Sequence, residues 1–215
     1  MQAPRTDSFV VGLVLGAGGS TRLGCAKQLL PYRDGTLLGH VLGVARACSF
    51  DQIVVALGGA AREVRAGVDL TGTDPVVNDA YSSGCSSSIA AALEVVDQRC
   101  ELLVLMLGDQ PGVRADTVAA LRAGRGDAPL AVCRYEDGRG HPIAFARGVF
   151  ADLRDLHGDK GVWRLLDRRA SDVVEVPIAS SIPLDVDTPE DYRAVLAEAG
   201  VVDSAGVGPA VGILG

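Results

Sequence analysis

Short apolar runs alternate with helix-like stretches along most of this chain, and the alternation predicts an α/β fold around a mostly parallel sheet. The run at 9–15, Phe-Val-Val-Gly-Leu-Val-Leu, is nearly continuous in apolar residues, as expected for a strand covered on both faces. The run at 102–107 is the most apolar and is predicted to be the central strand. Further strands are predicted at 52–57, 75–77, 130–134, 142–145, 173–176 and 183–186.

Helices are predicted between these strands from apolar spacing and from end signals. Ile89, Leu93 and Val96 share one face of a helix expected over 86–97. The last helix begins at 188–191, Thr-Pro-Glu-Asp, where Thr188 can cap the first turn and proline takes the first helical position. The remaining helices are predicted at 37–47, 115–123, 149–156 and 162–168.

This pattern predicts one Rossmann-like α/β domain over residues 9–199, with helices on both faces of the sheet. Residues 1–8 are polar and are interpreted as an N-terminal tail. Residues 200–215 are rich in Gly, Ala and Val without clear periodicity, and we expect them to form a flexible C-terminal tail.

Composition narrows the class of protein. The chain is 48% hydrophobic and 22% charged, which is typical of a globular protein. Its formal charge is −7 with no long basic run, so nucleic acid is not expected as a partner. The five cysteines are scattered and form no Cys-x-x-Cys pair, which favours a reducing cytoplasm over a zinc or disulfide site. No apolar stretch approaches the roughly 20 residues of a membrane-spanning helix.

The loop after the first strand carries most of the chemical information. It reads Leu-Gly-Ala-Gly-Gly-Ser-Thr-Arg-Leu-Gly-Cys-Ala-Lys-Gln-Leu-Leu-Pro over residues 15–31. Its glycines allow backbone N–H groups to approach a ligand closely, and Arg22 and Lys27 supply positive charge for a polyphosphate. A dinucleotide fingerprint would need glycine where Thr21 stands, and a P-loop would need a Gly-Lys-Ser/Thr triplet that the sequence lacks.

This loop resembles the signature of the MobA-like NTP transferases, L-x-x-G-x-S-x-R-x-G-x-x-K-x-L-L-P, and the molybdenum cofactor cytidylyltransferase branch in particular. The matching positions are Leu15, Gly18, Ser20, Arg22, Gly24, Lys27, Leu29, Leu30 and Pro31. The resemblance implies a nucleotide-diphospho-sugar transferase-like fold in which the loop backbone holds the nucleotide. Nucleotide-binding roles are thereby implied for Leu15, Gly16, Ala17, Gly18, Gly19 and Ser20, and phosphate-binding, catalytic roles for Arg22 and Lys27.

Two acidic segments are predicted to hold Mg²⁺. Asp109 follows the expected central strand, at the sheet edge where ligands bind in open α/β folds, and it matches the family's G-D-x-P motif. The second segment, 184–191, resembles the family's D-x-D-T-P-E-D motif. Asp187, which leads directly into the last predicted helix, is the preferred second metal ligand and Asp185 the alternative. Alternation along a strand would place both on one side, so the sequence alone does not separate them.

Two further segments are candidates for binding the base and the acceptor. Residues 78–88 offer amides and hydroxyls to a base, and the family places the base pocket here; the candidates are Asn78, Ser83, Gly84 and Ser86. A serine-rich helix cap would use the same residues. The resemblance implies acceptor contacts from His141, Asp159 and Lys160, with a structural role for His141 as the alternative. Trp163 departs from the family pattern and leaves the acceptor in question.

The resemblance implies a Mg²⁺-dependent nucleotidyltransferase that moves CMP from CTP to a molybdopterin-type cofactor and releases pyrophosphate, with a molybdenum-hydroxylase as a possible partner protein. Ala17 favours CTP, whereas Gly16 departs from the cytidylyltransferase pattern and leaves GTP open. A flavin- or NAD(P)H-dependent oxidoreductase on the same fold is the alternative from another class. A non-catalytic cofactor chaperone is a third, and the retained acidic and basic residues argue against it.

Overall fold

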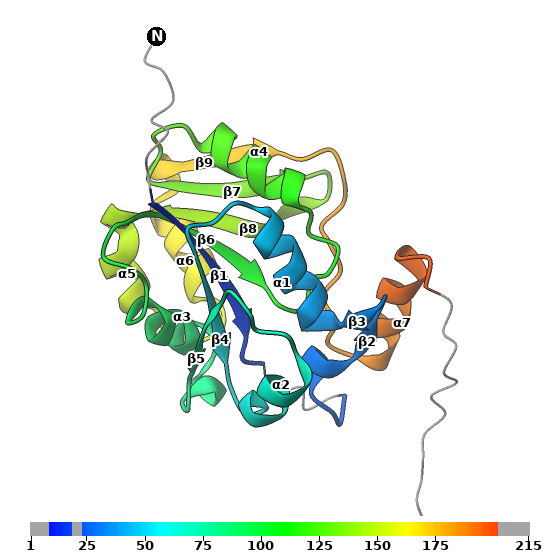
Figure 1. The fold of residues 1–215 in the computed structure, drawn as a ribbon. Helices are drawn as coiled ribbons and strands as arrows, with labels where there is room; N and C mark the ends of the chain where they lie inside the picture. Colours follow the sequence, from blue (N-terminus) through cyan, green and yellow to red (C-terminus); the bar gives the residue numbers. More distant parts are fainter. Residues whose placement is uncertain (1–8, 19–22, 202–215) are drawn as a thin grey trace, which may run out of the picture.

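Seven strands form the sheet at the centre of the protein, in the order β5-β4-β1-β6-β8-β7-β9 (Figure 1). The computed structural model describes residues 9–18 and 23–201. The strands are β1 (Phe9–Gly16), β4 (Gln52–Leu57), β5 (Asp74–Val77), β6 (Cys100–Leu107), β7 (Leu130–Tyr135), β8 (Gly138–Ala146) and β9 (Val173–Pro177). The strand at 102–107 is central, as predicted, and the α/β fold class is confirmed.

Most neighbouring strands run parallel. β1 pairs in parallel with β4 and β6, β4 with β5, and β7 with β9, whereas β8 is antiparallel to both β6 and β7. The carboxyl ends of β1, β4, β5 and β6 therefore lie at one edge of the sheet. The loops that leave this edge are where an open α/β sheet binds its ligands.

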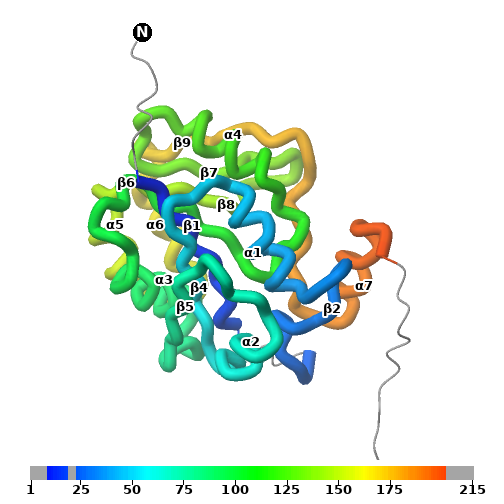
Figure 2. The backbone as a smooth tube through the Cα atoms, in the orientation of Figure 1, coloured from blue at the N-terminus to red at the C-terminus, as the bar shows by residue number. Residues whose placement is uncertain are grey.

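Helices cover both faces of the sheet, as Figure 2 also shows. One face packs against α1 (Leu37–Ala47), α2 (Ala61–Gly67) and α4 (Ala115–Arg125), and the other against α3 (Cys85–Leu93), α5 (Phe150–Arg154) and α6 (Gly161–Arg168). Along β1, Val10 and Val14 belong to the first core and Val11 and Leu13 to the second. Because side chains alternate along a strand, a continuous apolar run supplies both cores.

A third, smaller core lies beside the main sheet. The two-residue strands β2 (Pro31–Tyr32) and β3 (Gly35–Thr36) form a short hairpin next to α7 (Pro189–Glu198), and Tyr32, Leu37, Val186, Val195 and Leu196 are buried between them (Figure 1). Thr188 forms the predicted cap, with its side chain accepting a hydrogen bond from the Asp191 amide at 3.2 Å. The short 3-10 helix η1 (Lys27–Leu29) connects β1 to this region.

Some element predictions are wrong, each for a local reason. Residues 183–186 form no strand; the Val186 amide donates to the Asp109 carbonyl oxygen at 3.2 Å, but no ladder develops. The helix expected to reach 97 ends at Leu93, where consecutive valines at 95 and 96 disfavour further turns. The strand expected at 142–145 is longer than predicted, because β8 already begins at Gly138. Helix α2 has only Val64 buried and gave no readable apolar periodicity.

The described residues include no helix with the length and apolar character needed to cross a membrane. The tail predicted at 1–8 and all but the first two residues of the tail predicted at 200–215 lie outside the described residues, so the proposed domain limits stay a prediction.

Candidate nucleotide-binding site

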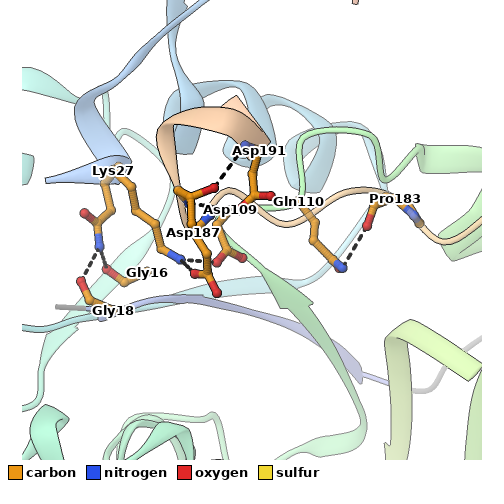
Figure 3. A network of polar contacts seen from close by, with 10 residues as sticks. Gly16, Gly18, Lys27, Asp109, Gln110, Pro183, Asp187 and Asp191 are labelled. Carbon is orange, nitrogen blue, oxygen red and sulfur yellow. Dashed lines mark hydrogen bonds and ion pairs between the residues drawn. The ribbon is translucent and has the colours of Figure 1, made fainter. Parts of the chain in front are cut away.

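Lys27 lies between two aspartates that are far away in the sequence. Its ammonium donates to Asp109 Oδ2 and, at 2.9 Å, to Asp187 Oδ1 (Figure 3). Asp109 follows β6, Asp187 directly precedes the cap of α7, and Lys27 begins η1. The lysine side chain is 11% exposed, against 19% for Asp109 and 44% for Asp187. Three residues predicted to act together therefore meet at the carboxyl edge of the sheet.

Backbone contacts fix the strand ends that carry this group. The Gly108 amide donates to the Leu15 carbonyl oxygen at 2.8 Å, which ties the end of β6 to the end of β1. A Cβ at Gly108 would lie 2.8 Å from that same oxygen, so only glycine permits the approach. Gln28, next to Lys27, donates from Nε2 to the carbonyl oxygens of Gly16 and Gly18 at 2.7 and 3.1 Å. The start of the glycine-rich loop is thus held against η1.

The capping box of α7 holds Asp187 in place. Asp191 accepts hydrogen bonds on Oδ2 from the amides of Thr188 at 2.8 Å and Asp187 at 3.2 Å. These bonds satisfy N–H groups that the first turn of a helix leaves without partners. The backbone of Asp187 is held by Asp191, and its side chain reaches Lys27. Figure 3 shows these three residues together.

Charge in this cluster is concentrated and mostly negative. Burial is the largest single influence on Lys27 and lowers its pKa, but the charges and hydrogen bonds of Asp109 and Asp187 together raise the pKa above its usual value. The side chain therefore stays cationic. For Asp185, partial loss of hydration of the carboxyl group, followed by the charges of Asp109 and Asp187, raises the pKa to about 6. Such a repulsion among carboxylates is relieved by a bound cation.

A cavity of about 750 Å³ opens beside this cluster and falls within the usual size range of small-molecule sites. Its walls come from the loops after β1, β5 and β6, together with β8 and α6. The lining residues are Leu15, Gly16, Ala17, Gly18, Lys27, Gln28, Tyr81, Ser82, Gly84, Cys85, Ser88, Leu105, Leu107, Gly108, Asp109, His141, Asp159, Val162, Trp163 and Asp187. Asp185 is not among them, so the cavity distinguishes the two aspartates that the sequence left open.

The predicted base-binding residues divide into two groups. Gly84 lines the cavity, whereas Asn78, Ser83 and Ser86 do not. The buried Asn78 donates from Nδ2 to Ser87 and Ser88 at 2.8 and 3.0 Å and accepts from the Ala80 amide at 2.9 Å. Its polar atoms are used in shaping the loop.

The predicted acceptor segment contacts the base segment directly. The Cys85 amide donates to Asp159 Oδ1 at 3.0 Å, and Ser86 Oγ donates to the Gly158 carbonyl oxygen at 2.5 Å. A Cβ at Gly84 would lie 2.7 Å from the Gly158 carbonyl carbon, and the φ of Gly84 is +108°, so glycine is required twice over. Lys160 is exposed and lies outside the cavity lining.

His141 and Trp163 were not connected by the sequence, yet they touch in the cavity wall. Their ring centroids are 5.5 Å apart at 76°, an edge-to-face arrangement. Burial lowers the pKa of His141 to about 4, so the imidazole is neutral near neutral pH. Sequence reasoning also missed Tyr81. The Gly58-Gly59 pair could have indicated a close neighbour at this point, because a Cβ at either glycine would collide with the Tyr81 side chain.

The cluster fits a divalent metal ion. Lys27 already holds a positive charge between Asp109 and Asp187, which demonstrates that the two carboxylates can share a cation. Among the described residues no group of three or more His, Cys, Asp or Glu is arranged as a metal site. Two carboxylates completed by phosphate oxygens and water are nevertheless the arrangement that Mg²⁺ commonly takes. Metal binding by Asp109 and Asp187 stays a prediction. The predicted loop residues Gly19, Ser20 and Arg22 lie outside the described residues.

A mostly parallel seven-stranded sheet with a glycine-rich first loop at its carboxyl edge defines an α/β protein of the nucleotide-diphospho-sugar transferase fold. A nucleotidyl transferase from Methanothermobacter thermautotroptrophicus has this fold, with a TM-score of 0.76, 19% identity, and coverage of 89% of this chain and 98% of that one.

The sequence profile described as "MobA-like NTP transferase domain" matches residues 12–173, and the chain belongs to this family. It is 31% identical over 198 residues to nicotine blue oxidoreductase of Paenarthrobacter nicotinovorans, covering 87% of this chain and 96% of that protein. The crystal structure of an Rv0371c homologue from Mycobacterium sp. strain JC1 is 52% identical, with a TM-score of 0.85 and coverage of 90% and 98%. Rv0371c of Mycobacterium tuberculosis H37Rv in complex with manganese is 47% identical, with a TM-score of 0.79 and coverage of 87% and 98%.

Proposed function

We propose that this protein is a Mg²⁺-dependent cytidylyltransferase that transfers CMP from CTP to a molybdopterin-type cofactor. In this reaction a phosphate oxygen of the acceptor attacks the α-phosphorus of CTP. The bond from that phosphorus to the bridging oxygen breaks, and pyrophosphate leaves. The acceptor supplies its own nucleophile, so the protein's task is to position two anionic substrates and to stabilise charge.

The observation that carries the proposal is the meeting of Lys27, Asp109 and Asp187 in one cavity with the glycine-rich loop. A hydride-transfer site has no need of two aspartates and a lysine beside a phosphate-binding loop. Phosphoryl and nucleotidyl transfer do need a cation held by carboxylates at the phosphates.

Each residue has a role that follows from its position. The backbone at Gly16, Ala17 and Gly18 lines the cavity and holds the nucleotide, and Lys27 neutralises phosphate charge once a ligand draws it away from the aspartates. Asp109 and Asp187 hold the metal, which when bound polarises the α-phosphate and neutralises charge on the leaving pyrophosphate. Arg22, which lies outside the described residues, is proposed to bind the triphosphate.

The manganese complex of an Rv0371c structure at 47% identity supports a divalent metal in this chain. The choice of CTP depends on Ala17, which lines the cavity next to the loop's first glycine. GTP is the alternative nucleotide. The same assay that distinguishes CTP from GTP also tests whether the metal is Mg²⁺ or another divalent ion.

A second candidate is a flavin- or NAD(P)H-dependent oxidoreductase. The observation in its favour is the 31% identity to a protein named nicotine blue oxidoreductase, spread over 96% of that relative. The glycine-rich loop has Thr21 in its sequence where a dinucleotide fingerprint that begins at Gly16 needs glycine, which favours the transferase.

The test is pyrophosphate release by the purified protein with molybdopterin and each NTP in turn, with Mg²⁺ or Mn²⁺. We expect release with CTP alone, and Asp109→Asn should lower the rate on the order of 100-fold or more because it removes a metal ligand. Asp116→Asn is the matched control: this aspartate is exposed on α4 and paired with Arg114, so its rate should equal that of the wild type.

Any other outcome of the pyrophosphate assay would contradict one part of the proposal. Release with GTP assigns the guanylyl reaction, and a near-normal rate for Asp109→Asn removes the metal role from that residue. Silence with every NTP, together with NAD(P)H oxidation when flavin is added, replaces the transferase with the oxidoreductase. Circular dichroism of the variant shows whether it is folded.

A further inference from the structure

The wall of the cavity formed by Trp163 and His141 differs in chemistry from the Lys27 end. The cavity lining includes the apolar Leu105 and Val162, and Val162 directly precedes Trp163 in α6. Among the described residues that line the cavity, Lys27 supplies the one positive charge, whereas Asp109, Asp159 and Asp187 are acidic. A phosphate group is consequently disfavoured at the Trp163 wall, and an uncharged part of a ligand is favoured there.

Trp163 is held in a fixed orientation. Its ring packs edge to face with His141, and the guanidinium carbon of Arg139 lies 6.0 Å from its centroid. Arg139 is in turn anchored to Asp167 at 2.7 Å, so its charge is compensated. A tryptophan fixed in this way binds a planar partner with little loss of side-chain entropy.

His141 adds an unused hydrogen-bonding group to the same wall. The residue is 9% exposed, and no hydrogen bond joins its imidazole to another described residue; the bond from the Tyr135 hydroxyl reaches only its backbone carbonyl. The neutral ring offers one N–H donor and one nitrogen acceptor. A buried polar group without a protein partner is costly unless a ligand or water satisfies it. The wall therefore suits a flat ring whose edge carries both donors and acceptors.

The order of strands indicates which substrate reaches this wall. β6, which ends at Leu107 just before Asp109, separates β1 and the loop after β5 on one side from β8 on the other. The nucleotide loop belongs to the first side, whereas His141 belongs to β8 and Trp163 to α6. Two substrates that meet at Asp109 would thus occupy opposite sides of β6, and the Trp163 wall belongs to the acceptor.

We propose that Trp163 and His141 bind the planar, uncharged heterocycle of the acceptor, a pterin-type ring, with Trp163 as the specificity-determining stacking surface. This inference rests on the proposed function for the identity of the acceptor. Trp163 is one of the residues at which the sequence departs from the pattern that it resembles, and it lines the cavity.

The test compares ligand binding by calorimetry in the wild type, Trp163→Phe and Trp163→Leu, with 6-hydroxymethylpterin and with CTP as separate probes. Trp163→Leu removes the aromatic stacking surface and should weaken pterin binding about tenfold. Trp163→Phe keeps a ring and should stay within about threefold of the wild type. The affinity for CTP should be unchanged in both variants. Thermal melting confirms that each variant is folded.

Other outcomes overturn the assignment. Equal weakening of CTP and pterin would place Trp163 at the nucleobase, and pterin binding that is absent in the wild type or unchanged in Trp163→Leu would remove the stacking role. Failure here is separable from failure of the proposed function. If pyrophosphate is released with CTP and molybdopterin but Trp163→Leu does not change the acceptor KM, only this inference is wrong. If pterin binding depends on Trp163 but no NTP gives pyrophosphate, only the proposed transferase activity is wrong.

Discussion

Lys27 and a divalent metal ion would use the same two carboxylates, so removal of the lysine should tighten metal binding. The Lys27 ammonium donates to Asp109 and Asp187, and a metal can reach both carboxylates only by displacing it. Lys27→Met keeps the length and apolar stem of the side chain but removes the charge. We expect Mn²⁺ to bind the variant more tightly than it binds the wild type.

The magnitude follows from the two hydrogen bonds. A hydrogen bond to a charged group contributes about 1.5–3 kcal/mol. Asp187 is 44% exposed, so its share is reduced by solvent screening, and we retain about 1.5 kcal/mol for the less exposed Asp109. This corresponds to about a tenfold lower Kd for Mn²⁺. The variant should also melt at a lower temperature without metal, because Asp109 is left without its counter-ion.

Mn²⁺ binding is measured by the decrease of the free-ion paramagnetic resonance signal, with and without CTP. Arg114→Met is the matched control, since it removes a cation from the exposed Asp116 and should leave Mn²⁺ affinity unchanged. In the wild type CTP should strengthen Mn²⁺ binding more than in Lys27→Met, because only the wild type has a lysine for the phosphates to draw away. Equal or weaker Mn²⁺ binding by Lys27→Met would refute the reasoning.

Two further predictions concern stability. Because burial lowers the pKa of His141 to about 4 and an unfolded histidine titrates near 6.5, the unfolded chain binds more protons between these values, and folding stability falls by about 1.4 kcal/mol for each unit by which the pH is lowered. Urea titrations should show the wild type losing up to about 3 kcal/mol of folding stability relative to His141→Asn as the pH falls across this window. Parallel stability curves for the two proteins would contradict the assignment. Asp185 is present in both proteins, so its titration does not contribute to the difference. Thr188→Ala should cost about 1 kcal/mol by removing the cap of α7, whereas Thr117→Ala, in the first turn of α4, should cost less than half of that. An equal loss for the two threonine variants would mean that the cap does not hold the helix.

The parts of the fold that were predictable are those with strong periodicity and clear ends. The helix at 37–47 and the strand at 52–57 have the predicted limits, since the helix buries a regular apolar face and the strand is apolar and buried on both faces. The segment 183–186 misled because its alternating residues resemble a strand, while Pro183 and the absence of a pairing partner among the described residues prevent one. Strand alternation, by which Asp185 and Asp187 looked equivalent, therefore does not apply to them.

The meeting of Lys27, Asp109 and Asp187 was also predictable, because topology brings strand ends together and the motifs marked which ends mattered. The use of each polar side chain was not. Asn78 and Ser86 looked like ligand-binding groups, but the structure uses both to hold loops. Nothing in the sequence singled out Gln28, and the role of Trp163 was left open. Their contacts with the glycine-rich loop and with His141 were seen only in the folded structure. Such assignments depend on side-chain direction, which periodicity does not encode.

The close approach of Gly84 to Gly158 has a consequence for redesigning this protein. No Cβ fits between the two backbones, and the hydrogen bonds of Cys85 and Ser86 join them further. The loop proposed to bind the nucleotide and the loop proposed to bind the acceptor are therefore joined by direct backbone contacts. An exchange of acceptor specificity by grafting the 156–164 segment of a relative requires the 82–88 segment of the same relative, because the two surfaces are complementary to each other and not to a generic neighbour.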